Sequence, residues 1–191
     1  MTWDPYLDLG SGVLHNRLGL TDRARLRAAE AEFATLRLAQ LHLDPLAGDF
    51  DLPHLCAIHR AVLGDVYDWA GELRTVSLGR GALYCLPHRL VPYAGEVFGR
   101  LTRARRLRCR SRAPFVDGLT RLFAELHYLH PFREGSGLAQ RAFLGQLAVA
   151  AGHPVRWAAM DPAEHAAAAR AAHLARDTVP LRALLDRLVV S

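Results

Sequence analysis

Twelve consecutive residues, from His130 to Arg141, carry the side chains best suited to chemistry on a phosphorylated substrate. They read His-Pro-Phe-Arg-Glu-Gly-Ser-Gly-Leu-Ala-Gln-Arg. The imidazole can take a proton, the carboxylate can hold a divalent cation, and the final arginine can bind phosphate. This order of residue types favours phosphate chemistry at one site.

Two apolar helical segments position this stretch. Residues 114–129 carry apolar side chains at three- and four-residue spacing, which predicts a buried helix that delivers His130 at its C-terminal end. These apolar residues are Phe115, Leu119, Leu122, Phe123 and Leu126. Pro131 ends that helix, and we expect the next helix to begin near Leu138.

The two glycines between these helices predict an anion-binding loop. Gly135 and Gly137 allow a tight turn and a close approach of the backbone to a ligand. The free amides at the start of the next helix, with its positive end, would point into the loop. Glu134 could then hold a cation that bridges phosphate oxygens, and Arg141 could reach a terminal phosphate.

Two stretches of the chain are similar to sequences of the Fic family. Residues 130–141 resemble its signature H-x-F-x-[DE]-G-N-G-R-x-x-R, and ten of the twelve positions fit, wildcards included. Residues 67–74, Tyr-Asp-Trp-Ala-Gly-Glu-Leu-Arg, match the Y-x-W-A-G-x-x-R stretch that precedes the flap in that family. The lead-in at residues 12–19 also looks like that of many Fic proteins.

The resemblance implies an all-α, Fic-like helical fold with a short β-hairpin flap. It implies an enzyme, a nucleotidyltransferase that moves AMP from ATP to a hydroxyl side chain of a target protein. ATP would be the co-substrate and Mg²⁺ the cofactor. His130 would be the general base, Glu134 would hold Mg²⁺, and Phe132 would anchor the loop in the core. The implied nucleotide-binding residues are Phe132, Arg133, Gly135, Ser136, Gly137 and Arg141.

The flap itself is expected over residues 74–88. Residues 75–78 alternate like a short strand, residues 79–81 have turn chemistry, and residues 82–86 could form the return strand. In the Fic family this flap holds the target polypeptide as an added strand, a known mode of peptide recognition. The residues expected to bind the target are Thr75, Val76, Ser77, Leu78 and Gly79.

Two positions depart from the signature. Ser136 replaces its asparagine, and Leu138 replaces its first arginine. Losing a charge-assisted contact to phosphate costs roughly 1.5 to 3 kcal/mol. We therefore expect weakened ATP use, a different phosphate donor, or loss of activity. Two alternatives stay open: a Fic-fold enzyme repurposed to another donor or small substrate, and a non-catalytic binding module.

Length and composition indicate one soluble globular domain. The chain has 191 residues, of which 51% are hydrophobic and 23% charged. We expect a single Fic-like domain over residues 1–191, with a core at about 22–152 and a helical extension at 153–191. Further helices are expected at 22–43, 52–63, 92–106, 161–176 and 180–190, and the histidines of the last two, His165 and His173, are interpreted as structural.

The net charge of +5 comes from one arginine-rich run. Seven arginines lie between residues 100 and 112, at positions 100, 103, 105, 106, 108, 110 and 112. No aromatic residue interleaves them to stack on bases, so a solvated helix end is preferred and nucleic acid is not an expected partner. The three cysteines have no paired spacing, which argues against a zinc site or a disulfide scaffold.

The remaining expectations concern location and partners. No apolar run approaches 18 residues and no signal-peptide pattern opens the chain, so a cytoplasmic protein without a membrane partner is expected. Many Fic enzymes are inhibited by a helix with the pattern [ST]-x-x-x-E-[GN], and no serine or threonine here has a glutamate four residues on. Either a separate small antitoxin chain restrains a toxin of this kind, or the changes at Ser136 and Leu138 make restraint unnecessary.

Overall fold

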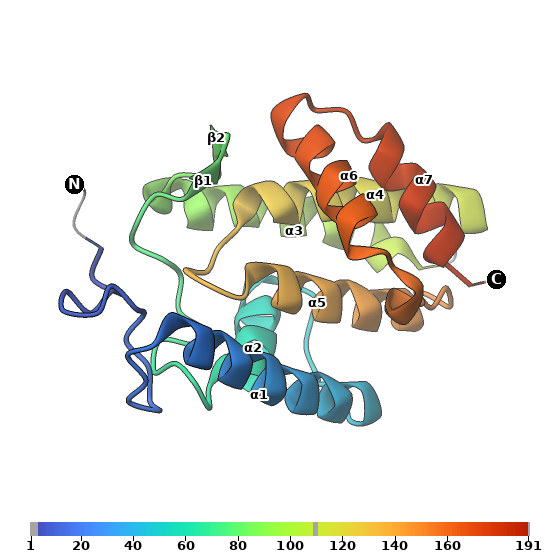
Figure 1. The fold of residues 1–191 in the computed structure, drawn as a ribbon. Coiled ribbons are helices and arrows are strands. Elements are labelled where there is room, and N and C mark those ends of the chain that lie inside the picture. Colours follow the sequence, from blue (N-terminus) through green and yellow to red (C-terminus); the bar gives the residue numbers. More distant parts are fainter. Residues whose placement is uncertain (1–3, 109–110, 191) are drawn as a thin grey trace.

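The computed structural model describes residues 4–108 and 111–190 and shows helices joined by short connections, with one small hairpin (Figure 1). The helices are α1 (Arg23–Leu43), α2 (Leu52–Leu63), α3 (Leu90–Arg103), α4 (Arg112–Leu129), α5 (Ser136–Ala150), α6 (Pro162–Leu174) and α7 (Val179–Leu188). Strands β1 (Gly79–Arg80) and β2 (Ala82–Leu83) pair antiparallel. The predicted all-α fold is confirmed.

Aspartate caps fix where three of the helices begin. The side chain of Asp22 accepts a hydrogen bond from the backbone N–H of Arg25 at the start of α1. Asp51 caps α2 and Asp161 caps α6 in the same way. Each cap satisfies an amide that the helix itself leaves without an acceptor, and therefore the local sequence set these boundaries.

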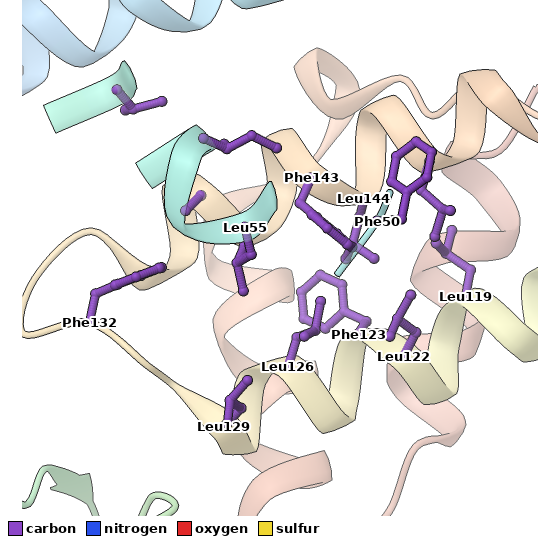
Figure 2. Close-up of a cluster of buried hydrophobic side chains, with 14 of the residues drawn as sticks. Phe50, Leu55, Leu119, Leu122, Phe123, Leu126, Leu129, Phe132, Phe143 and Leu144 are labelled. Atoms are coloured by element: carbon purple, nitrogen blue, oxygen red, sulfur yellow. The ribbon is translucent and has the colours of Figure 1, made fainter. Parts of the chain in front are cut away.

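Helix α5 runs through the middle of the molecule, with α1 and α2 on one side and α4 on the other (Figure 1). Its inward face supplies Phe143 and Leu144, which are fully buried. Figure 2 shows these side chains meeting Leu55 of α2 and Phe123 of α4 in one hydrophobic cluster. The core therefore fixes both helices that flank the predicted loop.

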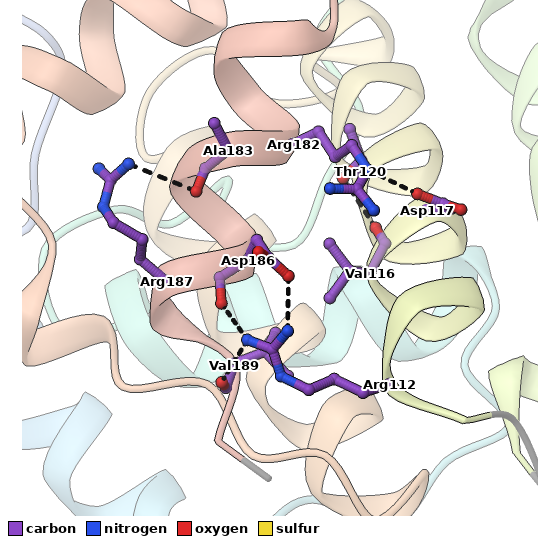
Figure 3. A network of polar contacts seen from close by, with 9 residues as sticks. All are labelled: Arg112, Val116, Asp117, Thr120, Arg182, Ala183, Asp186, Arg187 and Val189. Carbon is purple, nitrogen blue, oxygen red and sulfur yellow. Dashed lines mark hydrogen bonds and ion pairs between the residues drawn. The ribbon is translucent and has the colours of Figure 1, made fainter.

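Polar contacts fasten the C-terminal helix α7 to α4. Arg112 forms an ion pair with Asp186 at 2.6 Å, and Arg182 pairs with Asp117 at 2.8 Å (Figure 3). These side chains are substantially exposed, so each pair contributes on the order of 1 kcal/mol or less. Four buried leucines on the inner side of α7 do more to hold the helix in place: Leu181, Leu184, Leu185 and Leu188.

The hairpin differs from its prediction. Each strand is two residues long, the turn is Gly81 with φ of 81°, and the pairing begins at Gly79 rather than Thr75. Residues 75–78 form no ladder. The physical reason lies in Arg74, whose guanidinium donates to the carbonyl of Val76 at 2.6 Å and thereby takes an acceptor that a strand would use.

Several side chains of the arginine-rich run form ion pairs with different parts of the fold. Arg100 pairs with Glu125 at 2.8 Å, Arg106 pairs with Asp49 at 2.8 Å, and Arg112 belongs to the α4–α7 contact. Residues 105–107 turn through positive φ values between 54° and 59°, which separates the ends of α3 and α4. Arg110 and Cys109 lie outside the described residues. Three members of the run therefore tie elements of the fold together.

Within residues 4–108 and 111–190, no helix combines the length and the apolar character that a membrane crossing requires.

Candidate active site

His130 terminates α4 in an unusual backbone conformation. Its φ and ψ are 40° and 62°, in the left-handed region that few non-glycine residues adopt. Pro131 follows and cannot continue a helix. The backbone therefore reverses at this point, and residues 131–135 form a short loop that leads directly into α5. Such local strain commonly occurs at functional sites.

The His130 imidazole lies flat against Tyr84, which directly follows the hairpin. The ring centroids are 4.0 Å apart and the planes differ by 5°. Neither ring nitrogen has a hydrogen-bond partner among the described residues. Burial is the main cause that lowers the pKa of His130, and together with the positive potential of His127, Arg74, Arg80 and His173 it brings the pKa to about 3. The ring is therefore neutral near pH 7 and able to accept a proton.

The first turn of α5 presents unoccupied backbone amides. Gly135 precedes the helix with φ of 72°, and no side chain caps the helix. The N–H groups of Ser136 and Gly137 have no acceptor among the described residues. The N–H of Gly135 donates to the Glu134 carboxylate at 3.1 Å. Together with the positive end of α5, these groups have the geometry that an anion-binding loop requires, as expected from the two glycines.

His130 and these amides line one cavity of about 690 Å³. Its walls come from the loop, the start of α5, the end of α4, the hairpin and one side of α6. The lining includes Arg80, Tyr84, His127, His130, Glu134, Gly135, Ser136, Gly137, Leu138, Gln140, Arg141, His165, Arg170 and His173. The cavity is large enough for a nucleotide-sized ligand.

Arg141 is the strongest anion-binding candidate in this cavity. Its side chain runs back toward the start of α5, where its Nη1 lies 3.5 Å from the position that a Cβ on Gly137 would occupy. Burial lowers the pKa of Arg141, and no carboxylate pairs with it among the described residues. Arg80 and Arg170 also line the cavity, against the single carboxylate of Glu134. An anionic ligand would balance this excess of positive charge.

Glu134 lies at the mouth of the cavity and is exposed to solvent. No group of three or more histidine, cysteine, aspartate or glutamate side chains among the described residues could enclose a metal ion. One exposed carboxylate beside a phosphate-binding loop nevertheless suits Mg²⁺, which commonly binds one or two carboxylates together with substrate phosphates. The residues present therefore fit the cation that the resemblance implied.

Two of the residues expected to bind nucleotide point away from the cavity. Phe132 is fully buried and packs in the core, as expected for an anchor of the loop. The guanidinium of Arg133 pairs with Asp4, with Nη2 at 2.9 Å and Nε at 3.0 Å from the same carboxylate oxygen. Both side chains hold the outer side of the loop, and neither lines the cavity.

Ser136 lines the cavity but its hydroxyl is engaged within the loop. The Oγ atom accepts from the N–H of Phe132 and donates to the Phe132 carbonyl, both at 3.1 Å. The side chain is 5% exposed. A phosphate contact through this hydroxyl would require it to give up one of these two bonds. In this structure the Ser136 side chain therefore stabilises the conformation of the loop.

Arg74, the last residue of the aromatic and glycine-rich stretch, links the hairpin to the loop. It is 2% exposed. Its Nε donates to the carbonyl of His130 at 2.8 Å, and its Nη groups donate to the carbonyls of Val76 and Cys85. Its backbone N–H donates to the carbonyl of Pro131 at 2.9 Å. One side chain thus fixes both stems of the hairpin and the backbone of His130.

Helix α6 supplies a cavity wall that sequence reasoning missed. His165, Arg170 and His173 all line the cavity, although the two histidines were interpreted as structural. His173 lies 3.2 Å from the carbonyl of Ala82 in the hairpin, through its Nε2. The eight-residue spacing of the two histidines was a visible signal of a shared face. That spacing did not indicate which part of the molecule this face of the helix would pack against.

Comparison with known proteins agrees with this geometry. The family model described as Fic/DOC family matches residues 49–148, which is more than half of the chain. The chain belongs to the Fic/DOC family. Its matched region includes the hairpin, the loop and most of α5, so every element of the Fic site except the α6 wall lies within it.

Two relatives and one solved structure illustrate the similarity. "Probable protein adenylyltransferase Fic" of Salmonella typhimurium is 41% identical over 155 residues, 81% of this chain and 76% of the relative. "Protein adenylyltransferase VbhT" of Bartonella schoenbuchensis is 38% identical over 155 residues, 81% of this chain but 32% of that protein. The structure of BepC from Bartonella tribocorum, described with bound AMPPNP, superposes with a TM-score of 0.91 at 23% identity, covering 97% of this chain and 96% of that one. The Fic fold therefore extends over nearly the whole chain.

Proposed function

We propose that this chain is a protein adenylyltransferase, which transfers AMP from ATP to a hydroxyl side chain of a target protein. One observation carries the proposal: the neutral imidazole of His130, the free amides of α5 and the unpaired guanidinium of Arg141 share a single cavity. A base facing a phosphate site is what transfer to a hydroxyl requires. The printed names of the relatives support the same activity.

In the proposed reaction the target hydroxyl donates its proton to His130 while its oxygen attacks the α-phosphorus of ATP. A new oxygen–phosphorus bond forms, and the bond from the α-phosphorus to the bridging oxygen of the β-phosphate breaks. Pyrophosphate leaves, and the imidazolium returns its proton to solvent. Proton transfer of this kind typically contributes roughly 10² to 10⁴ in rate.

The loop and the start of α5 would bind the phosphates. The N–H groups of Ser136 and Gly137 donate to phosphate oxygens, and Arg141 binds the far end of the triphosphate. Glu134 would hold Mg²⁺, which supplies neutralisation of phosphate charge when it is bound. On binding, the Glu134 carboxylate would release the N–H of Gly135, which then becomes a further donor to phosphate. Phe132 and Arg133 contribute by fixing the loop.

The target polypeptide would add along the exposed edge at residues 75–79. The carbonyls of Val76 and Leu78 already accept hydrogen bonds within the molecule, from Arg74 and from the N–H of Tyr84. Ser77, between them, has neither its N–H nor its carbonyl paired among the described residues. Ser77 is therefore free to pair with an added strand. Pairing of this kind is how the segment Thr75, Val76, Ser77, Leu78 and Gly79 is expected to bind the target.

The proposal is tested by following two labelled forms of ATP in the presence of Mg²⁺ and a cell extract. Label in the α-phosphate should enter protein, whereas label in the γ-phosphate should leave as pyrophosphate. His130→Ala should lower the incorporation by a factor of 100 or more. His42→Ala, an exposed histidine at the end of α1, should retain it. Incorporation that survives in His130→Ala contradicts the proposed base.

A second candidate, an enzyme of the same fold with another donor, is favoured by Leu138. This side chain makes one part of the cavity wall apolar where the family signature has arginine. In a thermal-shift panel of nucleotides and phosphodiesters, this candidate predicts stabilisation by a ligand other than ATP. If no compound stabilises the protein and no turnover depends on His130, the chain is a binding module.

We also propose that restraint of the enzyme, where it operates, comes from a second chain in the cytoplasm. A groove of about 330 Å³ between α1 and the loop shares Glu134, Gly135 and Leu138 with the site. A helix bound there would touch the phosphate-binding loop directly. Ala31→Arg, at the exposed rim of the groove on α1, should abolish inhibition by such a chain while leaving AMP transfer unchanged. Inhibition that is insensitive to Ala31→Arg contradicts this location.

A further inference from the structure

His59 of α2 makes two hydrogen bonds that connect distant parts of the chain. Its Nδ1 accepts from the backbone N–H of Gly71 at 2.7 Å. Its Nε2 lies 2.9 Å from the carbonyl of Glu134, within the phosphate-binding loop. Because Nδ1 is an acceptor, the neutral ring carries its proton on Nε2 and donates it to Glu134. The ring is completely buried, and burial lowers its pKa to about 4, which keeps it neutral.

The bond to Glu134 controls the direction of the next amide. In a trans peptide the C=O and N–H groups point in opposite directions. The Glu134 carbonyl is directed toward α2 by His59, so the N–H of Gly135 in the same peptide is directed away from α2. That N–H meets the Glu134 carboxylate at the mouth of the cavity. His59 therefore determines which way a phosphate-binding amide faces.

Packing around His59 leaves this peptide little freedom to rotate. The ring stacks on Phe132 of the loop, with centroids 3.8 Å apart and planes 16° apart. The centroid of the His59 ring also lies 6.4 Å from that of Trp69, with planes 27° apart, and Trp69 stacks on Tyr67 at 4.2 Å. The Tyr67 hydroxyl donates to Glu30 of α1 at 2.5 Å. A series of rings thus runs from Tyr67, which is bonded to α1, to Phe132 of the loop, with His59 next to the loop.

We propose that His59 is a positioning residue for AMP transfer, which holds the Glu134–Gly135 peptide so that its N–H faces the nucleotide phosphates. The inference rests on the proposed function for its catalytic consequence. It assigns a role to a residue that touches neither the cavity nor the reacting atoms. Misplacing a phosphate donor by about 1 Å can cost about a hundredfold in rate.

Two substitutions separate the two hydrogen bonds. In His59→Asn the amide occupies the place of Nδ1, so it keeps the bond to Gly71 and loses the bond to Glu134. In His59→Gln the longer amide reaches the place of Nε2, so it keeps the bond to Glu134 and loses the bond to Gly71. A positioning role predicts that His59→Asn loses ten- to a hundredfold in kcat/KM for ATP, and that His59→Gln retains most of it.

His54 on the same helix provides a matched control. It is 4% exposed, its Nδ1 accepts from the N–H of Phe50 at 3.3 Å, and its Nε2 lies 3.1 Å from the carbonyl of Leu46. His54→Asn therefore removes the same kind of bond without touching the loop. It should lower the melting temperature about as much as His59→Asn does, and it should leave kcat/KM per folded molecule unchanged.

A second readout is independent of activity. Amide NMR of ¹⁵N-labelled protein should show shifted, faster-exchanging signals for Gly135 and Ser136 in His59→Asn, and near-native signals in His59→Gln and His54→Asn. If the parent protein neither binds nor turns over ATP, the proposed function fails, while the NMR comparison still judges the positioning of the loop. Native loop signals in His59→Asn, or full activity in that variant, overturn the inference.

Discussion

Leu138 and Ser136 occupy the two positions where this chain departs from the Fic signature, and their surroundings differ. Leu138 is half-buried and lines both the cavity and the neighbouring groove, so a longer side chain there has space to extend. Ser136 is buried, and its hydroxyl makes two bonds within the loop. The two departures therefore affect the site by different routes, one through charge and the other through loop geometry.

Restoring the signature should therefore have unequal effects at the two positions. Leu138→Arg should tighten ATP binding by about ten- to a hundredfold, since one charge-assisted contact contributes about 1.5–3 kcal/mol. Ser136→Asn alone should lower stability without tightening binding, because it breaks both bonds to Phe132. Calorimetric titration with a non-hydrolysable ATP analogue measures both effects, and Leu138→Gln serves as the uncharged control. Equal gains from the two single substitutions would argue against this division.

Gly135 offers a stability prediction at the same scale. Its φ of 72° disfavours any other residue, and an added Cβ would lie 2.1 Å from Leu63. Gly135→Ala should destabilise the protein by about 1–3 kcal/mol and abolish ATP binding. Gly95→Ala, on an exposed part of α3 where a Cβ meets no atom within 4 Å, should instead stabilise by up to about 1 kcal/mol. Urea unfolding of both variants measures the contrast.

The cavity-lining residues that the sequence could predict are those of the loop and the start of α5. His130, Glu134, Gly135, Gly137 and Arg141 were predictable because their order along one short stretch implies proximity. His59 was not, because an isolated histidine on a helix gives no information about its partner, here 75 positions away in the chain. Only the packing of α2 against α5 brings that partner within reach.

Among the elements, the hairpin depends most on a single side chain. Arg74→Met should leave the carbonyls of Val76, Cys85 and His130 without their donor, at about 1–3 kcal/mol for each buried group left unpaired. We expect a lower melting temperature and a loss of transfer to protein targets that exceeds any loss of ATP affinity. Arg89→Met, an exposed change at the start of α3, is the control. A variant that transfers AMP normally would show that the hairpin is held by other contacts.

The helices were easier to predict than the hairpin. Period, caps and prolines are local signals, and α2 has the predicted bounds of 52–63. The helix predicted at 92–106 instead begins at Leu90 and ends at Arg103, where the left-handed turn at 105–107 intervenes. The predicted bounds of the first strand were wrong because the alternation at 75–78 carries no information about Arg74, which binds the Val76 carbonyl.

At the scale of the whole molecule, buried neutral histidines predict the pH dependence of stability. The pKa is lowered to about 4 in His59 and His127 and to about 3 in His130. Below about pH 6.5 the unfolded chain binds protons at these residues and the folded chain does not. The free energy of unfolding should therefore fall from pH 6.5 to about 4, by at most about 1.4 kcal/mol per pH unit for each residue.

Urea unfolding between pH 7 and pH 5 measures this dependence. His127→Gln should reduce the slope, because it removes one group that protonates only in the unfolded chain over this range. His42→Gln, at the exposed end of α1, should leave the slope unchanged. An identical slope in the parent and in His127→Gln would show that this histidine is protonated in the folded protein.

The position of α6 over the cavity could not be predicted from the local sequence, just as the contact between His59 and Glu134 could not. In both cases the contacting segments are far apart in the chain. Its alanine-rich sequence fits many surfaces, so periodicity predicts a helix without predicting its neighbour. The arginine run illustrates the converse case. The side chains of this run are separated in space, since Arg100 pairs with Glu125 on α4 and Arg106 pairs with Asp49 in the connection between α1 and α2.

The buried guanidinium of Arg74 also fixes the distance between the target-binding segment and His130. Arg74 donates to the carbonyl of Val76, in the segment proposed to bind the target, and to the carbonyl of His130, the proposed base. An acceptor side chain must span the gap between those two fixed points, and serine, threonine and tyrosine differ in how far their oxygen extends from the main chain. Under the proposed function, Arg74 would therefore influence which hydroxyl side chain is modified, through the distance that the side chain has to span.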